Sequence, residues 1–203
     1  MNPVLLSVAG NPENQDCGLV VTAGSRTVLC VADGAGGLSG GTEAAVMAAE
    51  FVRQHAPRLA SAGDCANLLQ RADAAIAKDI AAGETTLITV VIDSTEIFGA
   101  SVGDSGAWFI PPTGQWIDLS GRQQRKPFVG SGSARSVPFQ RGGDAGLLLL
   151  ATDGLLKYTS AERIVEICRH NAPDVAAQKL IELVKYPSGR FPDDVTVILM
   201  NTH

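Results

Sequence analysis

The sequence has little charge and no long apolar run. Of its 203 residues, 18% are charged and 5% are aromatic, and the formal net charge is −5. Nucleic-acid-binding proteins carry a basic face that replaces counterions, so this balance argues against a nucleic-acid partner. No segment approaches the roughly 20 apolar residues of a membrane span. The first residues, 1–4, also lack the basic start and apolar run of a signal peptide, so we expect no membrane partner.

Cysteine and histidine are scarce and scattered. No two cysteines have the C-x-x-C spacing of a metal or redox motif, and the three histidines do not cluster. This argues against a zinc site. We expect buried thiols in a cytoplasmic protein, at Cys17, Cys30, Cys65 and Cys168.

Hydrophobic residues make up 45% of the chain, enough for a stable core. No linker, repeat or low-complexity tract divides the sequence, so we expect one domain over residues 1–203. Short apolar runs bounded by turn residues predict strands at 4–8, 18–22, 27–32, 86–92, 97–102, 107–110, 147–151 and 195–200. The continuous run 147–151 predicts a strand covered on both faces.

Apolar residues at helical spacing occur in two pairs of segments. One pair carries Ala45, Ala48, Val52 and Ala56, then Cys65, Leu68, Leu69, Ala72, Ile76 and Ile80. The other pair begins near Ser160, a candidate N-cap, and at Pro173, which suits a first helical turn. Strands and helices thus come in blocks, which favours an α+β fold with antiparallel sheets over a doubly wound parallel fold.

Five aspartates stand at the edges of apolar strands, mostly beside glycine or another turn residue. They are Asp16, Asp33, Asp104, Asp153 and Asp193. A single Asp-Gly pair is explained by an ordinary turn. Five carboxylates at one rim repel each other unless a cation lies among them, and oxygen ligands favour Mg²⁺ or Mn²⁺.

Six short motifs follow one another along the chain. They are Asn14-Gln15-Asp16, Val31-Ala32-Asp33-Gly34-Ala35-Gly36-Gly37, Thr85-Thr86, Ser101-Val102-Gly103-Asp104-Ser105, Ala151-Thr152-Asp153-Gly154-Leu155 and Asp193-Asp194-Val195-Thr196. Their order resembles that of the PPM (type 2C) Ser/Thr protein phosphatases, and the similarity extends from about residue 10 to residue 200. The resemblance implies a four-layer α/β/β/α sandwich, in which two antiparallel sheets are flanked by helix pairs. It also implies hydrolysis of phosphoserine and phosphothreonine in proteins by water that two Mn²⁺ or Mg²⁺ ions activate.

The same resemblance assigns roles to the residues. Asp33 would bridge the two metals, with the Gly34 carbonyl as a further ligand, and Asp153 and Asp193 would complete the first metal site. Asp16 would hold a water and accept its proton. Asp104 would bind a third, weaker metal together with Asp153. Asp16, Asp33 and Asp153 are therefore the expected catalytic residues.

The chain departs from the family pattern at three positions. Asn11 stands where many members have an arginine that grips the phosphate, and a neutral amide cannot form that bidentate pair. Gly106 replaces the arginine of an Asp-Ser-Arg motif. Ala35 stands where eukaryotic members have a histidine.

The segment between Leu119 and Gly146 is short for the family's substrate flap and is rich in arginine. Either it is a solvated loop, or one of Arg122, Arg125, Arg135 and Arg141 replaces the missing phosphate clamp.

Two other functions stay open. The Asn11 substitution is compatible with a pseudophosphatase that binds or regulates without turnover. A hydrolase of small phosphoesters would use the same chemistry, but the glycine-rich segment 34–41 lacks the lysine of a P-loop, which excludes a P-loop NTPase. For the phosphatase we expect a monomer, a phosphoprotein substrate and an opposing Ser/Thr kinase.

Overall fold

The computed structural model describes residues 2–35 and 40–202. Gly36 and Gly37, which end the motif that begins at Val31, lie outside the described residues.

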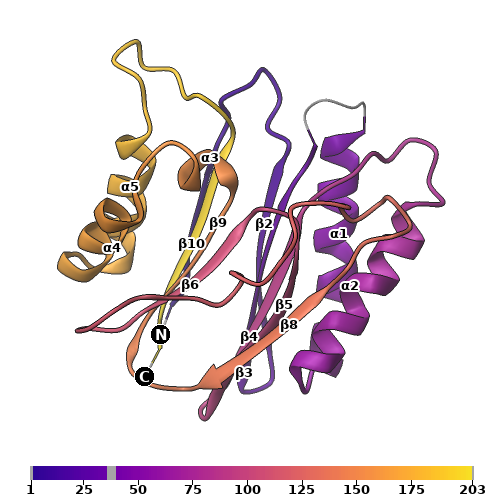
Figure 1. The fold of residues 1–203 in the computed structure, drawn as a ribbon, viewed down its shortest axis with the longest axis horizontal. Helices are drawn as coiled ribbons and strands as arrows, with labels where there is room; N and C mark the ends of the chain where they lie inside the picture. Colours follow the sequence, from indigo (N-terminus) through magenta and orange to yellow (C-terminus); the bar gives the residue numbers. More distant parts are fainter. Residues whose placement is uncertain (1, 36–39, 203) are drawn as a thin grey trace.

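Two antiparallel sheets of five strands each form the centre of the fold (Figure 1). The first sheet has the order β1-β10-β9-β6-β7. Its strands are β1 (Val4–Val8), β10 (Val195–Thr202), β9 (Gly146–Ala151), β6 (Gly106–Ile110) and β7 (Ile117–Asp118). The second sheet has the order β2-β3-β4-β5-β8. Its strands are β2 (Asp16–Ala23), β3 (Arg26–Asp33), β4 (Leu87–Ile92), β5 (Glu96–Val102) and β8 (Val137–Gly142).

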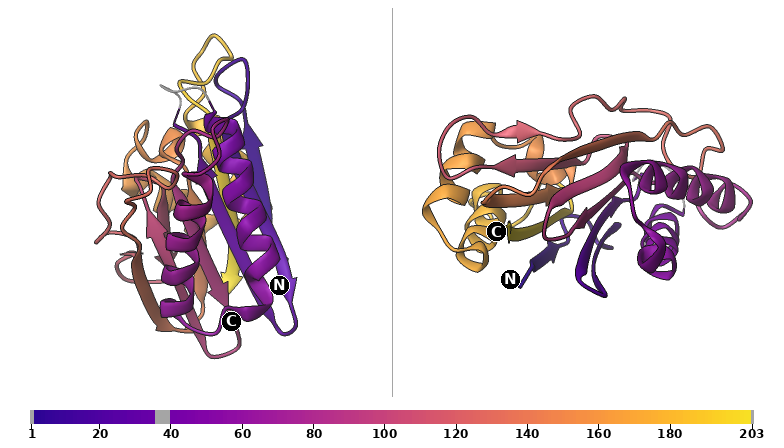
Figure 2. Two further views of the ribbon diagram at one scale, coloured as in Figure 1. Left: turned by 90° about the vertical axis from the view of Figure 1, so that its right-hand side faces the viewer. Right: turned by 90° about the horizontal axis from the view of Figure 1, so that it is seen from below.

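Helices cover the outer face of each sheet, and Figure 2 shows the four layers in its right-hand view. The second sheet is covered by α1 (Gly41–His55), the 3₁₀ turn η1 (Ala56–Arg58) and α2 (Ala62–Ile76). The first sheet is covered by α4 (Ala161–His170) and α5 (Pro173–Leu183), and the short α3 (Asp153–Leu156) follows β9. The predicted α/β/β/α sandwich is confirmed.

The apolar core has three layers because each sheet is buried on both faces. One layer joins α1 and α2 to the second sheet, and another joins α4 and α5 to the first sheet. The third lies between the sheets. Along β9, Leu147 and Leu149 face the helices whereas Leu148 and Leu150 face the other sheet, which confirms a strand covered on both faces.

Every predicted strand is present, with ends shifted by up to two residues. The prediction that Ile80 belongs to the apolar stripe of a helix was wrong, since α2 ends at Ile76 and Ile80 is fully exposed. Hydrogen bonds from the Lys78 and Asp79 amides to residues three positions earlier tighten the last turn of this helix.

The segment read as a flap is only partly a loop. Its last part forms β8, which pairs with β5 along six residues. Alternate β8 residues are exposed because successive side chains point to opposite faces of the strand and one of these faces is open to solvent. Within the described residues, each helix is too short or too polar to reach across a bilayer.

Candidate metal centre

Antiparallel pairing brings Asp16 and Asp33 together. Asp16 begins β2 and Asp33 ends β3, and the two residues are direct partners in the register. Because β2 and β3 run in opposite directions, the first residue of β2 and the last residue of β3 lie at the same end of the sheet. Two carboxylates 17 positions apart in the sequence therefore stand side by side.

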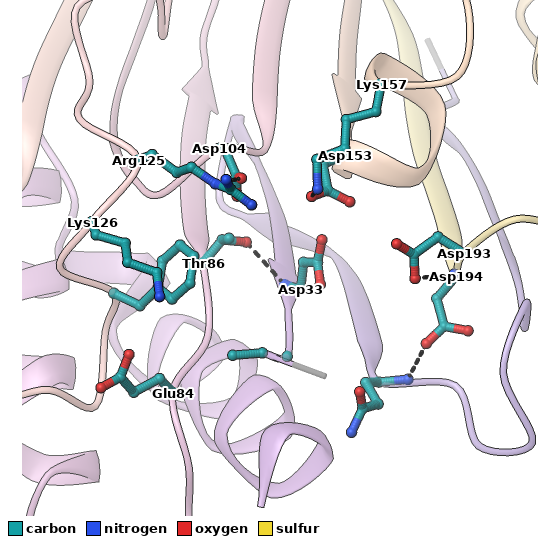
Figure 3. Close-up of a pocket in the computed structure, with 14 residues that line it drawn as sticks. Asp33, Glu84, Thr86, Asp104, Arg125, Lys126, Asp153, Lys157, Asp193 and Asp194 are labelled. Carbon is teal, nitrogen blue, oxygen red and sulfur yellow. Dashed lines mark hydrogen bonds and ion pairs between the residues drawn. The ribbon is translucent and has the colours of Figure 1, made fainter. Parts of the chain in front are cut away.

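The other three aspartates reach the same end of the molecule from different connections. Asp104 lies in the turn between β5 and β6, Asp153 begins α3 directly after β9, and Asp193 precedes β10. We call the five residues Asp16, Asp33, Asp104, Asp153 and Asp193 the aspartate cluster. All of them except Asp16 line a cavity of about 410 Å³ (Figure 3).

Gly34 and Gly154, which follow two aspartates of the cluster, let their backbones lie close to other segments of the chain. A Cβ on Gly34 would lie 2.4 Å from the carbonyl oxygen of Gly41, and one on Gly154 would lie 1.9 Å from that of Asp194. Neither site has room for a side chain. The Asp-Gly pairs thus serve tertiary packing as well as turning.

The backbone of Asp33 is held by two threonines that precede β4. Thr86 accepts a hydrogen bond from the Asp33 amide at 3.0 Å, and Thr85 donates one to the Asp33 carbonyl at 2.9 Å. The Thr86 hydroxyl also bonds the hydroxyl of Ser105, next to Asp104, at 2.7 Å. These contacts give the Thr85-Thr86 motif a positioning role.

Asp16 is half-buried, and only one of its two carboxylate oxygens has a hydrogen-bond partner among the described residues. Its Oδ2 accepts a hydrogen bond from the Thr152 hydroxyl at 2.8 Å, whereas its Oδ1 is buried and finds no hydrogen-bond partner among the described residues. Burial raises the pKa of Asp16 to about 7, although the hydrogen bonds to Thr152 and Thr196 oppose this rise. An orphaned carboxylate oxygen in such a place is suited to a cation or an ordered water.

The surroundings of Asp33 disfavour the ionised form of its carboxyl group. Burial, followed by the negative charges of its four cluster neighbours, raises its pKa to about 9. Burial also raises the pKa of Asp153, with Lys157 acting against the rise. The cluster therefore attracts positive charge at neutral pH.

Basic side chains supply part of that charge. Arg125 donates to Asp104 Oδ2 from its Nε at 2.6 Å, and Lys157 pairs with Asp153 along α3. Lys126 also lines the cavity. Lys157 and Lys126 were missed in the sequence, although the spacing of four residues from Asp153 to Lys157 is a signal for an ion pair on a helix.

Of the four arginines considered as a phosphate clamp, Arg125 lines the cavity. Arg122 lines a different cavity between α2, β7 and β8. Arg141 pairs with Asp144 and lies over the Phe109 ring, and Arg135 does not line the aspartate cavity. The structure thus brings one of the four to the cluster and leaves the other three outside it.

Asp194 was also missed as a structural residue of the site. One of its oxygens accepts hydrogen bonds from the amides of Gly10 and Asn11, at 2.8 and 3.1 Å, and the other accepts from the Gln15 amide at 2.8 Å. Asn11 Nδ2 reaches Asp193 Oδ1 at 3.3 Å. Position 11 is therefore adjacent to the cluster.

The chemistry of the donor set fits hard cations such as Mg²⁺ or Mn²⁺. The set consists of carboxylates, with an orphaned oxygen on Asp16, and it contains no thiol or imidazole. Among the described residues, no three acidic, histidine or cysteine side chains lie close enough together in this conformation to hold a metal ion. The side chains of Asp33, Asp153 and Asp193 would therefore have to turn toward a bound cation.

Comparisons with known proteins agree with this reading. The family model described as protein phosphatase 2C matches residues 8–185. A bacterial serine phosphatase superposes with a TM-score of 0.87 at 17% identity, over 100% of this chain and 98% of its own. The Mycobacterium tuberculosis serine/threonine phosphatase PstP superposes with a TM-score of 0.80 at 24% identity, over 100% and 98%.

The catalytic domain of PstP in complex with two manganese ions gives a TM-score of 0.79 at 23% identity, over 100% of this chain and 98% of that domain. No curated protein matches the chain. Family and fold confirm the predicted class of enzyme, a metal-dependent serine/threonine phosphatase. The chain belongs to the protein phosphatase 2C family.

Proposed function

We propose that this chain removes phosphate from phosphoserine and phosphothreonine of a protein substrate with two Mn²⁺ or Mg²⁺ ions at the aspartate cluster. The observation that carries the proposal is the convergence of five carboxylates, whose charges act on Asp33. Figure 3 shows four of them, Asp33, Asp104, Asp153 and Asp193. When bound, the metals would supply an activated water and neutralise phosphate oxygens.

The residues of the chain would divide this work. Asp33, the Gly34 carbonyl, Asp153 and Asp193 would hold the metals. Asp16 would accept a proton from water, since its buried Oδ1 has no hydrogen-bond partner among the described residues. Thr85 and Thr86 would keep Asp33 in place through their hydrogen bonds to its backbone.

Arg125 is the arginine best placed to take the role of the phosphate clamp that Asn11 lacks. It lines the cavity, and its side chain is 66% exposed, so it can turn toward a ligand. A guanidinium can bind two phosphate oxygens at once. We expect Arg125→Ala to raise the KM for a phosphopeptide.

We also propose that the protein is cytoplasmic, is a monomer and acts in opposition to a Ser/Thr kinase. The four cysteines are free thiols, which suits a reducing compartment. We further propose that residues 1–203 form a single catalytic domain. Gel filtration would test the monomer.

The test is hydrolysis of an aryl phosphate and a phosphothreonine peptide, with and without Mn²⁺, by the wild type, Asp33→Ala and the exposed control Asp174→Ala. We expect Mn²⁺-dependent turnover that Asp33→Ala abolishes and Asp174→Ala keeps. Faster turnover of nucleotides than of phosphopeptides would indicate a small-phosphoester hydrolase.

Asn11 is the observation that favours the second candidate, a pseudophosphatase. A wild type that binds Mn²⁺ but does not turn over any of these substrates would support that function.

A further inference from the structure

Two carboxylates of the cluster are already paired with basic side chains. Arg125 Nε lies 2.6 Å from Asp104 Oδ2, and Lys157 Nζ contacts Asp153 Oδ2. Figure 3 shows both pairs next to Asp33. The carboxylates are mostly buried, with side chains 20% and 13% exposed, whereas Arg125 and Lys157 are 66% and 44% exposed.

The backbone sets the position of both pairs. Lys157 follows Asp153 by four residues, and its amide bonds the Asp153 carbonyl at 2.8 Å, so the two side chains project from the same side of the helical turn. Arg125 is positioned by its neighbour Gln123, whose side chain donates to the Ser105 carbonyl at 2.6 Å. The loop that carries Arg125 is thereby fixed beside Asp104.

We propose that Arg125 and Lys157 take the place of a third cation at Asp104 and Asp153, so that the chain binds two metal ions and not three. The inference rests on the proposed function. Lys157 contacts Asp153 through Oδ2, so the first metals would use Oδ1 of this carboxylate. A third ion between Asp104 and Asp153 would have to displace both Arg125 and Lys157 or lie beside them, and adjacent like charges repel. The predicted third, weaker metal site therefore does not fit this chain.

The same arrangement keeps positive charge in the cavity without a third metal. The guanidinium of Arg125 and the ammonium of Lys157 are partly exposed, and both side chains line the cavity. A phosphate group held at the first two metals would meet these cations where the chain has no arginine at position 11. Arg125 and Lys157 would thus contribute the positive charge that a third ion would otherwise supply.

Calorimetric titration with Mn²⁺ tests the inference without an activity assay. The proteins are the wild type, the double variant Arg125→Met/Lys157→Met, and the control Lys185→Met. Lys185 lies just after the end of α5 and also forms an ion pair, with Glu182 of that helix, at 2.9 Å but outside the cavity. Circular dichroism would check folding, and Arg125→Gln/Lys157→Gln is the second pair if the methionines destabilise the protein.

We expect two Mn²⁺ per chain for the wild type and Lys185→Met, and a third, weaker one for the double variant. Three ions in the wild type, or only two in a folded double variant at the same final Mn²⁺ concentration, would overturn the inference and leave the proposed function standing. A wild type that binds no Mn²⁺ would contradict both.

Discussion

The hydroxyl of Thr152 donates a hydrogen bond of 2.8 Å to Asp16 and so joins the two sheets at the aspartate cluster. Thr152 follows β9 of the first sheet, and Asp16 begins β2 of the second. The Thr152 hydroxyl also accepts from the Thr196 amide at 2.9 Å, which fixes its orientation. A fully buried side chain thus determines where the Asp16 carboxylate lies.

Thr152→Val should change the protonation of Asp16. The hydroxyl lowers the pKa of Asp16, so its loss should move the pH dependence of Mn²⁺ binding to higher pH and cost about 1–3 kcal/mol of stability. Calorimetry at several pH values and urea unfolding measure the two effects. Thr152→Ser keeps the hydroxyl and should behave as the wild type; equal shifts in both variants would contradict the assigned role.

The metal-free protein should become less stable as pH rises from about 5 to about 9. The pKa values of Asp16 and Asp33 are raised to about 7 and about 9 from an ordinary value of 3.8, so the folded state binds more protons than the unfolded state across this range. Stability is then lost as these groups ionise. Thermal unfolding over pH should show a falling Tm.

Saturating Mn²⁺ should oppose that fall, and Asp33→Asn should flatten it, because both remove the repulsion at Asp33. A Tm of the metal-free wild type that rises over the same pH range would disprove the prediction.

Asp73→Ala should destabilise the loop 130–134, which is connected to the metal centre through Val129 and Thr85. The Asp73 carboxylate, buried on α2, accepts hydrogen bonds from three amides of the loop 130–134, at 2.8, 2.9 and 3.0 Å. Next to that loop, Val129 pairs with Thr85, which bonds the Asp33 carbonyl. Loss of the carboxylate leaves these amides without their acceptor and should cost about 3 kcal/mol or more in urea unfolding.

The matched control is Asp79→Ala, since Asp79 is exposed just beyond the same helix and accepts one amide bond, from Ala81. It should stay within about 0.5–1.5 kcal/mol of the wild type. Equal losses in the two variants would show that Asp73 is no anchor.

Gly154→Ala should disrupt the metal centre through the backbone. The new Cβ would lie 1.9 Å from the Asp194 carbonyl oxygen, so the segment carrying Asp193 and Asp194 would have to move. We expect a loss of about 1–3 kcal/mol and weaker Mn²⁺ binding. Gly142→Ala is the control because a Cβ there meets nothing within 4 Å; weaker Mn²⁺ binding in that variant too would mean that the close approach at Gly154 is not the cause.

Asn11→Arg should lower the KM for a phosphopeptide. Position 11 adjoins the cluster, where Asn11 Nδ2 lies 3.3 Å from Asp193 Oδ1, and an added guanidinium there is within reach of a bound phosphate. We expect about a fivefold decrease, equivalent to about 1 kcal/mol. Asn67→Arg adds the same charge on α2, outside the cavity, and should leave KM unchanged; the same decrease in both would point to net charge alone.

The sequence by itself determined eight of the ten strands of the described structure, all except β7 and β8, together with the two helix pairs and the five aspartates. These features depend on local signals: apolar periodicity, turn residues, and acids placed where strands end. The family motifs added the sandwich and the metal chemistry. Even the error at Ile80 was local, because the stripe continued in the sequence after the last helical turn had closed at Ile76.

The tertiary structure decided which other groups surround the aspartates. Asp194 and Asp73 are ordinary acids in the sequence, yet each binds three amides of a loop far from it along the chain. Arg125 reaches Asp104, whereas Arg122 and Arg141 do not line the cavity, because the loop and β8 direct them elsewhere. Contacts between distant segments depend on how whole layers pack, and no local pattern encodes them.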